Sequence, residues 1–134
     1  MPTYQKLTPN LMVEDVDRTV DYYRDVLGFT LAATAPEQRP FEWAMVSSGG
    51  AELMFQSRES LSGEVPALRD RKIGGAFTIY IEVEDIEALY AHVQDRMPIV
   101  VDLHDTFYGA REFSAQDCNG YILGFAGRAN HGGE

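Results

Sequence analysis

The stretch Val13-Glu14-Asp15-Val16-Asp17 recurs in the second half of the chain as Val83-Glu84-Asp85-Ile86-Glu87, and this repeat decides the fold. An alternating apolar run precedes each copy, which is the period-2 pattern of a strand with one buried face. A helical pattern of apolar residues follows each copy, and Asp15 or Asp85 can cap its first backbone N–H groups. The repeat therefore predicts two similar halves, each with a strand that leads directly into a helix.

Three further strand-like segments follow each predicted helix. Gly28 ends the first helical pattern and Pro98 ends the second. The segments are residues 29–33, 42–46 and 51–56 in the first half, and 99–103, 111–115 and 121–126 in the second. Each half is thus predicted to be β-α-β-β-β. Between the halves, residues 57–75 carry seven charged residues and a proline, which predicts a surface connection with room for a short helix.

Composition and charge exclude several classes of function. The chain has 134 residues, and its 11 Lys and Arg against 21 Asp and Glu give a formal net charge of −10. This balance repels phosphate groups, so we expect neither a nucleic-acid partner nor a membrane partner. Cys118 is the single cysteine, which excludes an internal disulfide and a cysteine-based zinc site. With no signal-peptide pattern and no apolar run of membrane-spanning length, we expect a cytoplasmic location.

Two passages carry a resemblance to a known superfamily. The first is Leu11-Met12-Val13-Glu14-Asp15-Val16 with Asp21-Tyr22-Tyr23-Arg24-Asp25-Val26-Leu27-Gly28-Phe29, and the second is Tyr108-Gly109-Ala110-Arg111-Glu112-Phe113 with Asp117-Cys118-Asn119-Gly120-Tyr121. Over about residues 7–125, the chain resembles the vicinal oxygen chelate superfamily of glyoxalases, bleomycin-resistance proteins and extradiol dioxygenases. The resemblance implies an α+β fold, in which two tandem βαβββ modules form a curved eight-stranded sheet around a cleft.

The length of the chain and its repeat predict how the chain is organised. We expect residues 1–134 to form a single domain, with half-repeats at about 5–57 and 76–127 and a linker at 58–75. The chain resembles proteins whose two halves pair either within one chain or between two chains, and both arrangements stay open here. A homodimer with a small-molecule ligand is the expected assembly.

The metal-dependent branch of this superfamily holds a divalent ion at four equivalent positions of the two halves. On the residues of this chain, the resemblance puts Thr8 and Thr78 at the first-strand positions and Gly124 at one last-strand position. The remaining position is Glu52 or Met54, depending on how the first hairpin is aligned. Because a catalytic site needs about three protein ligands, we expect no metal and no other cofactor.

Strand alternation predicts which side chains face the cleft. The expected ligand-binding residues are Asn10, Trp43, Glu52, Met54, Tyr80, Tyr108 and Glu112, with Phe113 as a further aromatic neighbour. Trp43 and Tyr80 are equally consistent with ordinary sheet packing, and Met54 with filling of the core. Arg111 and Glu112 point to opposite faces of their strand, which favours Glu112 for the cleft.

Three residues are candidates for catalysis: Glu52, His104 and Glu112. Glu52 could anchor a cation, or act as a general base if desolvation raises its pKa. His104 stands beside acidic residues, which suggests acid–base chemistry, although one His in a loop is more often a polar surface residue.

Three functions are compatible with these residues. The first is a metal-independent binding protein that sequesters a cationic or aromatic compound, favoured by the missing ligand set, the acidic charge and the aromatic cleft. The second is a lyase or isomerase of the glyoxalase type with a non-standard metal or acid–base site. The third is a regulatory or structural module whose cleft has no ligand.

Overall fold

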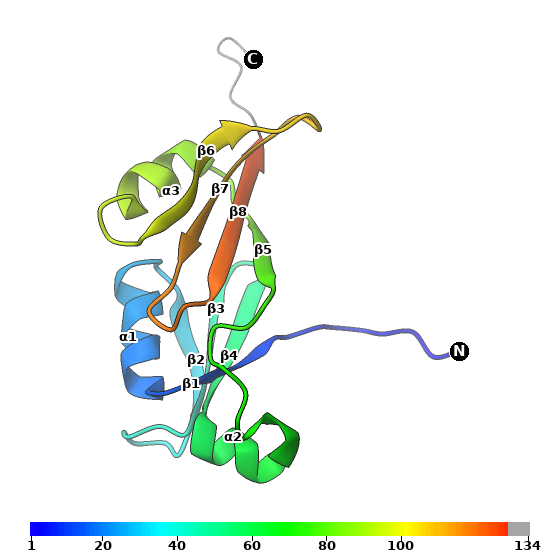
Figure 1. Cartoon of the computed structure of the whole chain (residues 1–134), viewed down its shortest axis with the longest axis vertical. Coiled ribbons are helices and arrows are strands. Elements are labelled where there is room, and N and C mark those ends of the chain that lie inside the picture. Colours follow the sequence, from blue (N-terminus) through cyan, green and yellow to red (C-terminus); the bar gives the residue numbers. More distant parts are fainter. Residues whose placement is uncertain (129–134) are drawn as a thin grey trace. The chain divides into compact units, whose positions relative to one another are not determined.

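The computed structural model describes residues 1–128, and contacts divide them into a first unit, Met1–Ile73, and a second unit that begins at Gly74. The first contains β1 (Asn10–Val13), α1 (Val16–Asp25), β2 (Thr30–Ala35), β3 (Trp43–Ser48), β4 (Ala51–Ser57), α2 (Arg58–Glu64) and the 3-10 helix η1 (Pro66–Leu68). The second contains β5 (Thr78–Glu82), α3 (Ile86–Val93), β6 (Ile99–Asp105), β7 (Ala110–Gln116) and β8 (Ile122–Arg128) (Figure 1).

Both units have the same sheet topology. The strand order is β1-β4-β3-β2 in the first unit and β5-β8-β7-β6 in the second. The first and last strands of each unit run parallel, and the other neighbours run antiparallel. This confirms the predicted α+β class with two βαβββ modules, and α2 and η1 occupy the predicted connection.

The repeat extends from the sequence into the pairing of the strands. Asn10 lies opposite Met54 on the parallel β1–β4 pair, and Tyr80 lies opposite Gly124 on the parallel β5–β8 pair. Both members of the second pair follow those of the first by the same offset that relates the two copies of the motif. Met54, and not Glu52, is therefore the structural equivalent of Gly124.

Each long helix begins at the aspartate that the repeat predicts. The side chain of Asp15 accepts a hydrogen bond from the backbone N–H of Arg18 at 3.0 Å, and that of Asp85 accepts one from Ala88 at 3.1 Å. These bonds satisfy N–H groups that lack a partner in the first turn of a helix. The start of the helix is thus set by the same short motif in both units.

Each helix packs on one face of its own sheet. In the first unit, Tyr23 of α1 contacts Phe55 of β4 with ring centroids 4.8 Å apart, and both side chains are fully buried. In the second unit, α3 approaches β8 so closely that a Cβ at Gly127 would lie 2.8 Å from the Cβ of Ile86. Glycine is therefore required at this contact. The opposite face of each sheet is left for other contacts.

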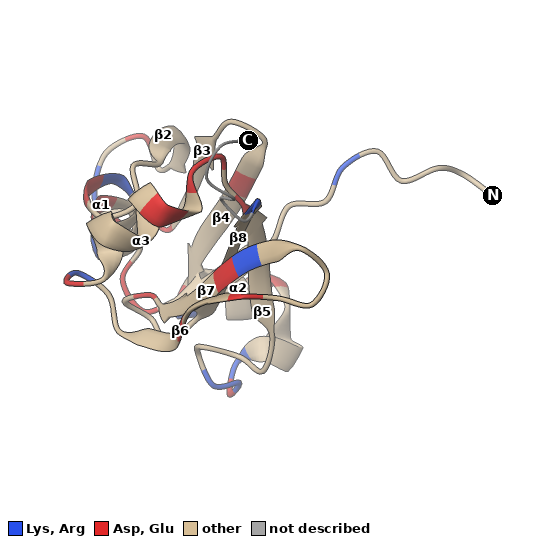
Figure 2. Cartoon of the chain, turned by 90° about the horizontal axis from the view of Figure 1, so that it is seen from above, with Lys and Arg blue, Asp and Glu red and all other residues tan. Residues whose placement is uncertain are grey.

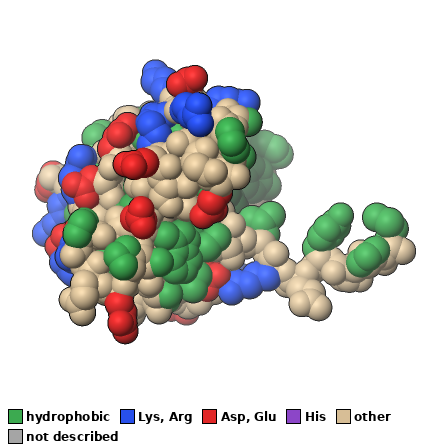
Figure 3. All heavy atoms as spheres, turned by 90° about the horizontal axis from the view of Figure 1, so that it is seen from below, with side chains coloured by type: hydrophobic (Ala, Val, Ile, Leu, Met, Phe, Trp, Pro, Cys, Tyr) green, Lys and Arg blue, Asp and Glu red, His purple; other side chains and the backbone are tan. Residues whose placement is uncertain are grey.

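The segment before β1 extends away from the first sheet. Met1, Tyr4 and Leu7 are more than four-fifths exposed, and Figure 3 shows hydrophobic side chains along this projecting segment. No helix among residues 1–128 is long and apolar enough to cross a bilayer.

Candidate functional site

Two tyrosines meet one carboxylate on the face of the second sheet that points away from α3. The hydroxyl of Tyr80 on β5 donates to Oε2 of Glu112 at 2.6 Å, and the hydroxyl of Tyr108 donates to the same oxygen at 2.6 Å. Both tyrosines remain more than half exposed. The arrangement orients two aromatic rings around a carboxylate and leaves Oε1 free of these two bonds.

These hydrogen bonds change the acidity of all three groups. The two tyrosine hydroxyls, Tyr108 first, lower the pKa of Glu112 below its usual value. The bond to Glu112 raises the pKa of Tyr80 to about 12 and also raises the pKa of Tyr108. A hydrogen bond to a carboxylate favours its charged form and disfavours loss of the donor's proton. Glu112 therefore stays an anion, and the tyrosines stay neutral, across the physiological range.

A tight hairpin places Tyr108 at this site. The backbone N–H of Thr106 donates to the carbonyl of Ala110 at 2.8 Å, and the N–H of Ala110 donates to Oγ1 of Thr106 at 3.0 Å. Phe107 at the tip is 99% exposed and packs edge-on against Tyr108, with ring centroids 4.9 Å apart. The hairpin thus adds a further exposed aromatic ring beside Tyr108.

His104 lies opposite Glu112 in the β6–β7 register. Its Nδ1 is 2.8 Å from the carbonyl oxygen of Asp102. Because a carbonyl oxygen can only accept, Nδ1 carries the proton in this contact. The side chain is exposed, as expected of the polar surface residue that the sequence also allows.

The neighbouring Arg111 belongs to the opposite face of β7. Its guanidinium binds Asp105 at 2.7 Å and Glu87 of α3 at 3.2 Å. Figure 2 shows the adjoining acidic and basic positions on this strand. Arg111 and Glu112 therefore point to opposite faces of β7, as strand alternation predicts.

The prediction for Phe113 is wrong. Its side chain is 1% exposed and packs against Tyr90 of α3 and Phe125 of β8, with centroids 5.1 Å apart in both pairs. Strand alternation explains this placement, because a residue next to Glu112 must point to the other face.

The first sheet carries a carboxylate with different partners. Lys6 Nζ lies 2.7 Å from Oε1 of Glu52, and the hydroxyl of Thr8 donates to the same oxygen at 3.0 Å. Lys6 and then Thr8 lower the pKa of Glu52 below its usual value. The condition for a general base, a pKa raised by desolvation, is therefore not met at Glu52.

The same face holds Asn10, Trp43 and Met54. Trp43 and Met54 are half-buried, Asn10 is exposed, and Met45 pairs directly with Met54. Asn10 also donates a hydrogen bond to Gln56, a residue that the sequence analysis did not single out. Strand alternation was the signal for Gln56, since it lies two positions beyond Met54 on β4.

The resemblance assigns three of the four metal positions to Thr8, Thr78 and Gly124 and leaves the fourth open between Glu52 and Met54. The strand register selects Met54 for it. None of the four residues so selected offers a carboxylate or an imidazole, which are the oxygen and nitrogen ligands of catalytic divalent ions. Within residues 1–128, no three His, Cys, Asp or Glu side chains are grouped so that they could hold a metal ion. The residues at these positions do not fit the ion of the metal-dependent branch.

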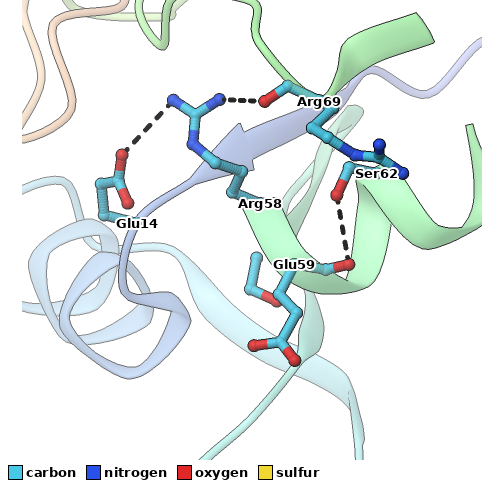
Figure 4. A pocket seen from close by; sticks show the side chains of 6 residues that line it. Glu14, Arg58, Glu59, Ser62 and Arg69 are labelled. Atoms are coloured by element: carbon cyan, nitrogen blue, oxygen red, sulfur yellow. Dashed lines mark hydrogen bonds and ion pairs between the residues drawn. The ribbon is translucent and has the colours of Figure 1, made fainter. Parts of the chain in front are cut away.

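A separate open pocket of about 390 Å³ lies beside α2 (Figure 4). Arg58 at its wall donates to the carbonyl oxygens of Arg69 and Arg71 at 2.8 and 2.9 Å, and to Glu14 at 3.4 Å. These bonds tie the start of α2 to the connecting segment. The side chain of Arg58 therefore has a structural role in this pocket, because it fixes the connecting segment against α2.

The structure thus brings together some predicted site residues. Tyr80, Tyr108 and Glu112 converge directly, with His104 on the neighbouring strand. Asn10, Trp43, Glu52 and Met54 share a face of the first sheet. The joint action of Glu52 with His104 or Glu112, and the cleft itself, stay predictions. Lys6 and Phe107 were missed, because their contacts come from a projecting segment and a hairpin tip without periodic pattern.

Comparison with known proteins gives the family. The profile of the Glyoxalase/Bleomycin resistance protein/Dioxygenase superfamily matches residues 7–125. No curated protein matches the chain.

Several solved structures have a similar fold. TioX from Micromonospora sp. ML1 has a TM-score of 0.73 at 22% identity, covering 94% of this chain and 100% of TioX. TnmS3, an antibiotic binding protein from Streptomyces sp. CB03234, has a TM-score of 0.73 at 20% identity, covering 96% and 99%. A glyoxalase/bleomycin resistance protein/dioxygenase from Nocardioides has a TM-score of 0.75 at 19% identity, covering 98% and 89%. At these identities the likeness shows the fold.

Proposed function

The chain belongs to the Glyoxalase/Bleomycin resistance protein/Dioxygenase superfamily, and we propose that within it this protein is metal-independent and binds and sequesters a small cationic or aromatic molecule. The observation that carries this proposal is the carboxylate of Glu112, held by the hydroxyls of Tyr80 and Tyr108 on an open sheet face.

The charge of Glu112 is available to a ligand. Among the ion pairs of residues 1–128, none joins a Lys or Arg to Glu112. The two phenols that bind it are neutral, so they orient the carboxylate without cancelling its charge. An organic cation placed here gains a charge-assisted hydrogen bond to the carboxylate and cation–π contacts with the surrounding rings.

Metal independence is supported by the residues at the four equivalent positions. Two hydroxyls, a thioether and a glycine replace the usual ligands. The likeness in fold to TnmS3, which is an antibiotic binding protein, is consistent with a binding role.

A binding role also agrees better with the acidities than general-base catalysis does. Glu52 and Glu112 both have pKa values below the usual range, which makes each a weaker base. The enzyme alternative needs a proton acceptor, whereas a binding site for a cation needs a persistent anion.

The test uses methylene blue, a flat aromatic cation, in a titration followed by absorbance. We expect the variant Glu112→Gln to bind the dye at least about tenfold more weakly, because it removes the negative charge that attracts the cation, and two opposite charges about 4 Å apart near a protein surface attract each other by about 4 kcal/mol. The matched control is Glu84→Gln, which removes the same charge from an exposed position on the turn before α3. Equal affinities of the wild type, Glu112→Gln and Glu84→Gln would contradict the proposal.

The dye titration also has a predictable pH dependence. Because the pKa of Glu112 is lowered, its carboxylate stays charged as the pH falls through the usual glutamate range. Binding should therefore weaken only below that range. A midpoint above the usual glutamate pKa would show that another group controls binding.

We also propose that the protein acts in the cytoplasm as a homodimer. The acidic charge and the single cysteine support the location, and the superfamily resemblance supports the dimer. Light scattering coupled to size-exclusion chromatography should give twice the chain mass of 15.0 kDa.

A further inference from the structure

The carboxylate of Glu112 presents two oxygens in different states. Oε2 accepts hydrogen bonds from the hydroxyls of both Tyr80 and Tyr108, each at 2.6 Å. A carboxylate oxygen has two lone pairs, so these two bonds use the full capacity of Oε2. No further hydrogen bond joins the Glu112 side chain to any group of residues 1–128, which leaves Oε1 as its open acceptor.

Two separate elements bring the hydroxyls to Oε2. Glu112 on β7 lies opposite Ala126 of β8, and Tyr80 lies on β5, the other neighbour of β8. The ring of Tyr80 passes beside Gly124 of β8, since a Cβ at Gly124 would lie 3.8 Å from its Cδ1. The second hydroxyl comes from Tyr108 on the hairpin between β6 and β7. Strand pairing and hairpin geometry therefore both hold the saturated oxygen in place.

Organic cations differ in how many carboxylate oxygens they engage. An ammonium group is a compact charge, and one of its N–H groups needs only one acceptor oxygen. An amidinium or guanidinium group is a planar fork, whose two parallel N–H groups bind both oxygens of a carboxylate at once. At Glu112 such a fork meets one open oxygen and one saturated oxygen. Its second N–H either stays without a partner or displaces a phenol, and both outcomes weaken binding.

We propose that the Glu112 site selects ammonium cations over amidinium and guanidinium cations, with the hydroxyls of Tyr80 and Tyr108 as the specificity-determining groups. This inference rests on the proposed binding function and adds the class of cation to it. The two aromatic rings are available to any bound cation, whereas the two hydroxyls act by occupying Oε2. Removing the hydroxyls should therefore change which cation is preferred.

The test compares benzylamine with benzamidine, which share a phenyl ring, one attached carbon and a single positive charge at neutral pH. Benzylamine ends in an ammonium group, and benzamidine ends in a planar amidinium fork. Each compound displaces methylene blue in a competition titration, and the measured quantity is the ratio of the two dissociation constants. We expect the wild type to bind benzylamine more tightly than benzamidine.

The double variant that combines Tyr80→Phe with Tyr108→Phe frees Oε2 and keeps both rings. We expect it to shift the ratio about three- to tenfold toward benzamidine, which is the usual effect of one added hydrogen bond. The matched control is Tyr90→Phe, which removes a hydroxyl from α3 on the other face of the same sheet and should keep the wild-type ratio. A general structural defect would weaken both cations and leave the ratio unchanged.

The double variant also shows whether the two hydrogen bonds form in solution. The hydroxyls of Tyr108 and Tyr80 lower the pKa of Glu112, so their removal should raise this pKa toward its ordinary value. NMR titration of the Glu112 side-chain carbon measures the change. An unchanged pKa would mean that the phenols do not saturate Oε2, and the inference would be wrong.

The outcomes separate the class of cation from the binding function. If methylene blue binds the wild type but the wild type prefers benzamidine, the inference about the cation is wrong and the binding function stands. The same holds if the double variant keeps the wild-type ratio. If neither methylene blue nor the two small cations bind the wild type, the proposed function fails and the inference fails with it.

Discussion

The two units place a carboxylate on the open face of the same sheet topology, but the partners of these carboxylates differ. Glu52 in the first unit is bound by the ammonium of Lys6 and the hydroxyl of Thr8. Glu112 in the second unit is bound by the hydroxyls of Tyr80 and Tyr108. Both arrangements lower the pKa of the carboxyl group.

The difference shows that a lowered pKa alone does not tell whether a carboxylate keeps a negative charge that a ligand can bind. A cationic partner lowers the pKa and also cancels the charge, whereas neutral phenols lower the pKa and leave the charge in place. Glu52 therefore ends as half of an ion pair, and Glu112 ends as an oriented anion with aromatic neighbours. This contrast is the basis for assigning the cation to the second unit.

The prediction with the largest expected effect tests whether the packed cores of the two units contribute equally to stability. Phe55 and Phe125 occupy equivalent positions of the repeat, and their side chains are 0% and 2% exposed. We expect Phe55→Ala and Phe125→Ala each to lower the free energy of unfolding by about 3–5 kcal/mol, because each leaves a cavity in a packed core. Urea unfolding measures both values. A loss below about 1 kcal/mol for either variant would contradict the equivalence of the two cores.

The next effect concerns the acidity of Tyr80. Its pKa of about 12 depends mainly on the bond to Glu112, so Glu112→Gln should return it toward the ordinary value of 10.0. Because the folded-state pKa is raised, this bond stabilises the fold below pH 10 and is lost as the pH rises toward about 12. Tyrosinate absorbance measures the titration, with Tyr80→Phe to identify the band. If the tyrosinate band of Tyr80 still appears at the same high pH in Glu112→Gln, the raised pKa of Tyr80 does not come from its bond to Glu112.

A smaller effect is expected at the carboxylate of the first unit. Lys6→Met removes the largest cause of the lowered pKa of Glu52, so this pKa should rise toward the ordinary value while Thr8 keeps part of the effect. The stability that Glu52 contributes is present above the ordinary glutamate pKa and is lost as the pH falls through its folded-state pKa. In the variant this loss should begin at higher pH.

NMR titration of the Glu52 side-chain carbon measures the change. Lys72→Met removes a lysine from the exposed connecting segment and serves as the control. If Lys6→Met and Lys72→Met give the same pKa for Glu52, the ion pair with Lys6 does not form in solution.

Much of the fold was predictable because one motif appears twice. Asp15 and Asp85 cap their helices as expected, and the six later strands begin and end close to their predicted bounds. The face of Glu112 was predictable from strand alternation, and the same rule should have placed Phe113 in the core. Period-2 and period-3.6 patterns are local, so a single sequence records them directly.

The partners within the candidate site were not predictable in the same way. Lys6 lies far from Glu52 in the sequence, and Tyr80 lies far from Glu112. The choice between Glu52 and Met54 as the equivalent of Gly124 also needed the register of β1 with β4. These contacts depend on strand pairing and side-chain reach, and neither leaves a local pattern in the sequence.

The smallest expected effect lies at Gly124, where the two units differ by a whole side chain. A Cβ at this position would meet only Oγ of Ser114 and Cδ1 of Tyr80, both at 3.8 Å, and the carbonyl oxygen of Ile79 at 3.9 Å, which are ordinary van der Waals contacts. Gly124→Ala should therefore be tolerated and raise the free energy of unfolding by about 0.4–1 kcal/mol, because alanine restricts the unfolded chain. Gly124→Met copies Met54 of the first unit and should weaken methylene blue binding, since its longer side chain occupies the space beside Tyr80. If Gly124→Met binds the dye as tightly as Gly124→Ala, the ligand does not occupy the face beside Tyr80, and the second unit has no advantage over the first.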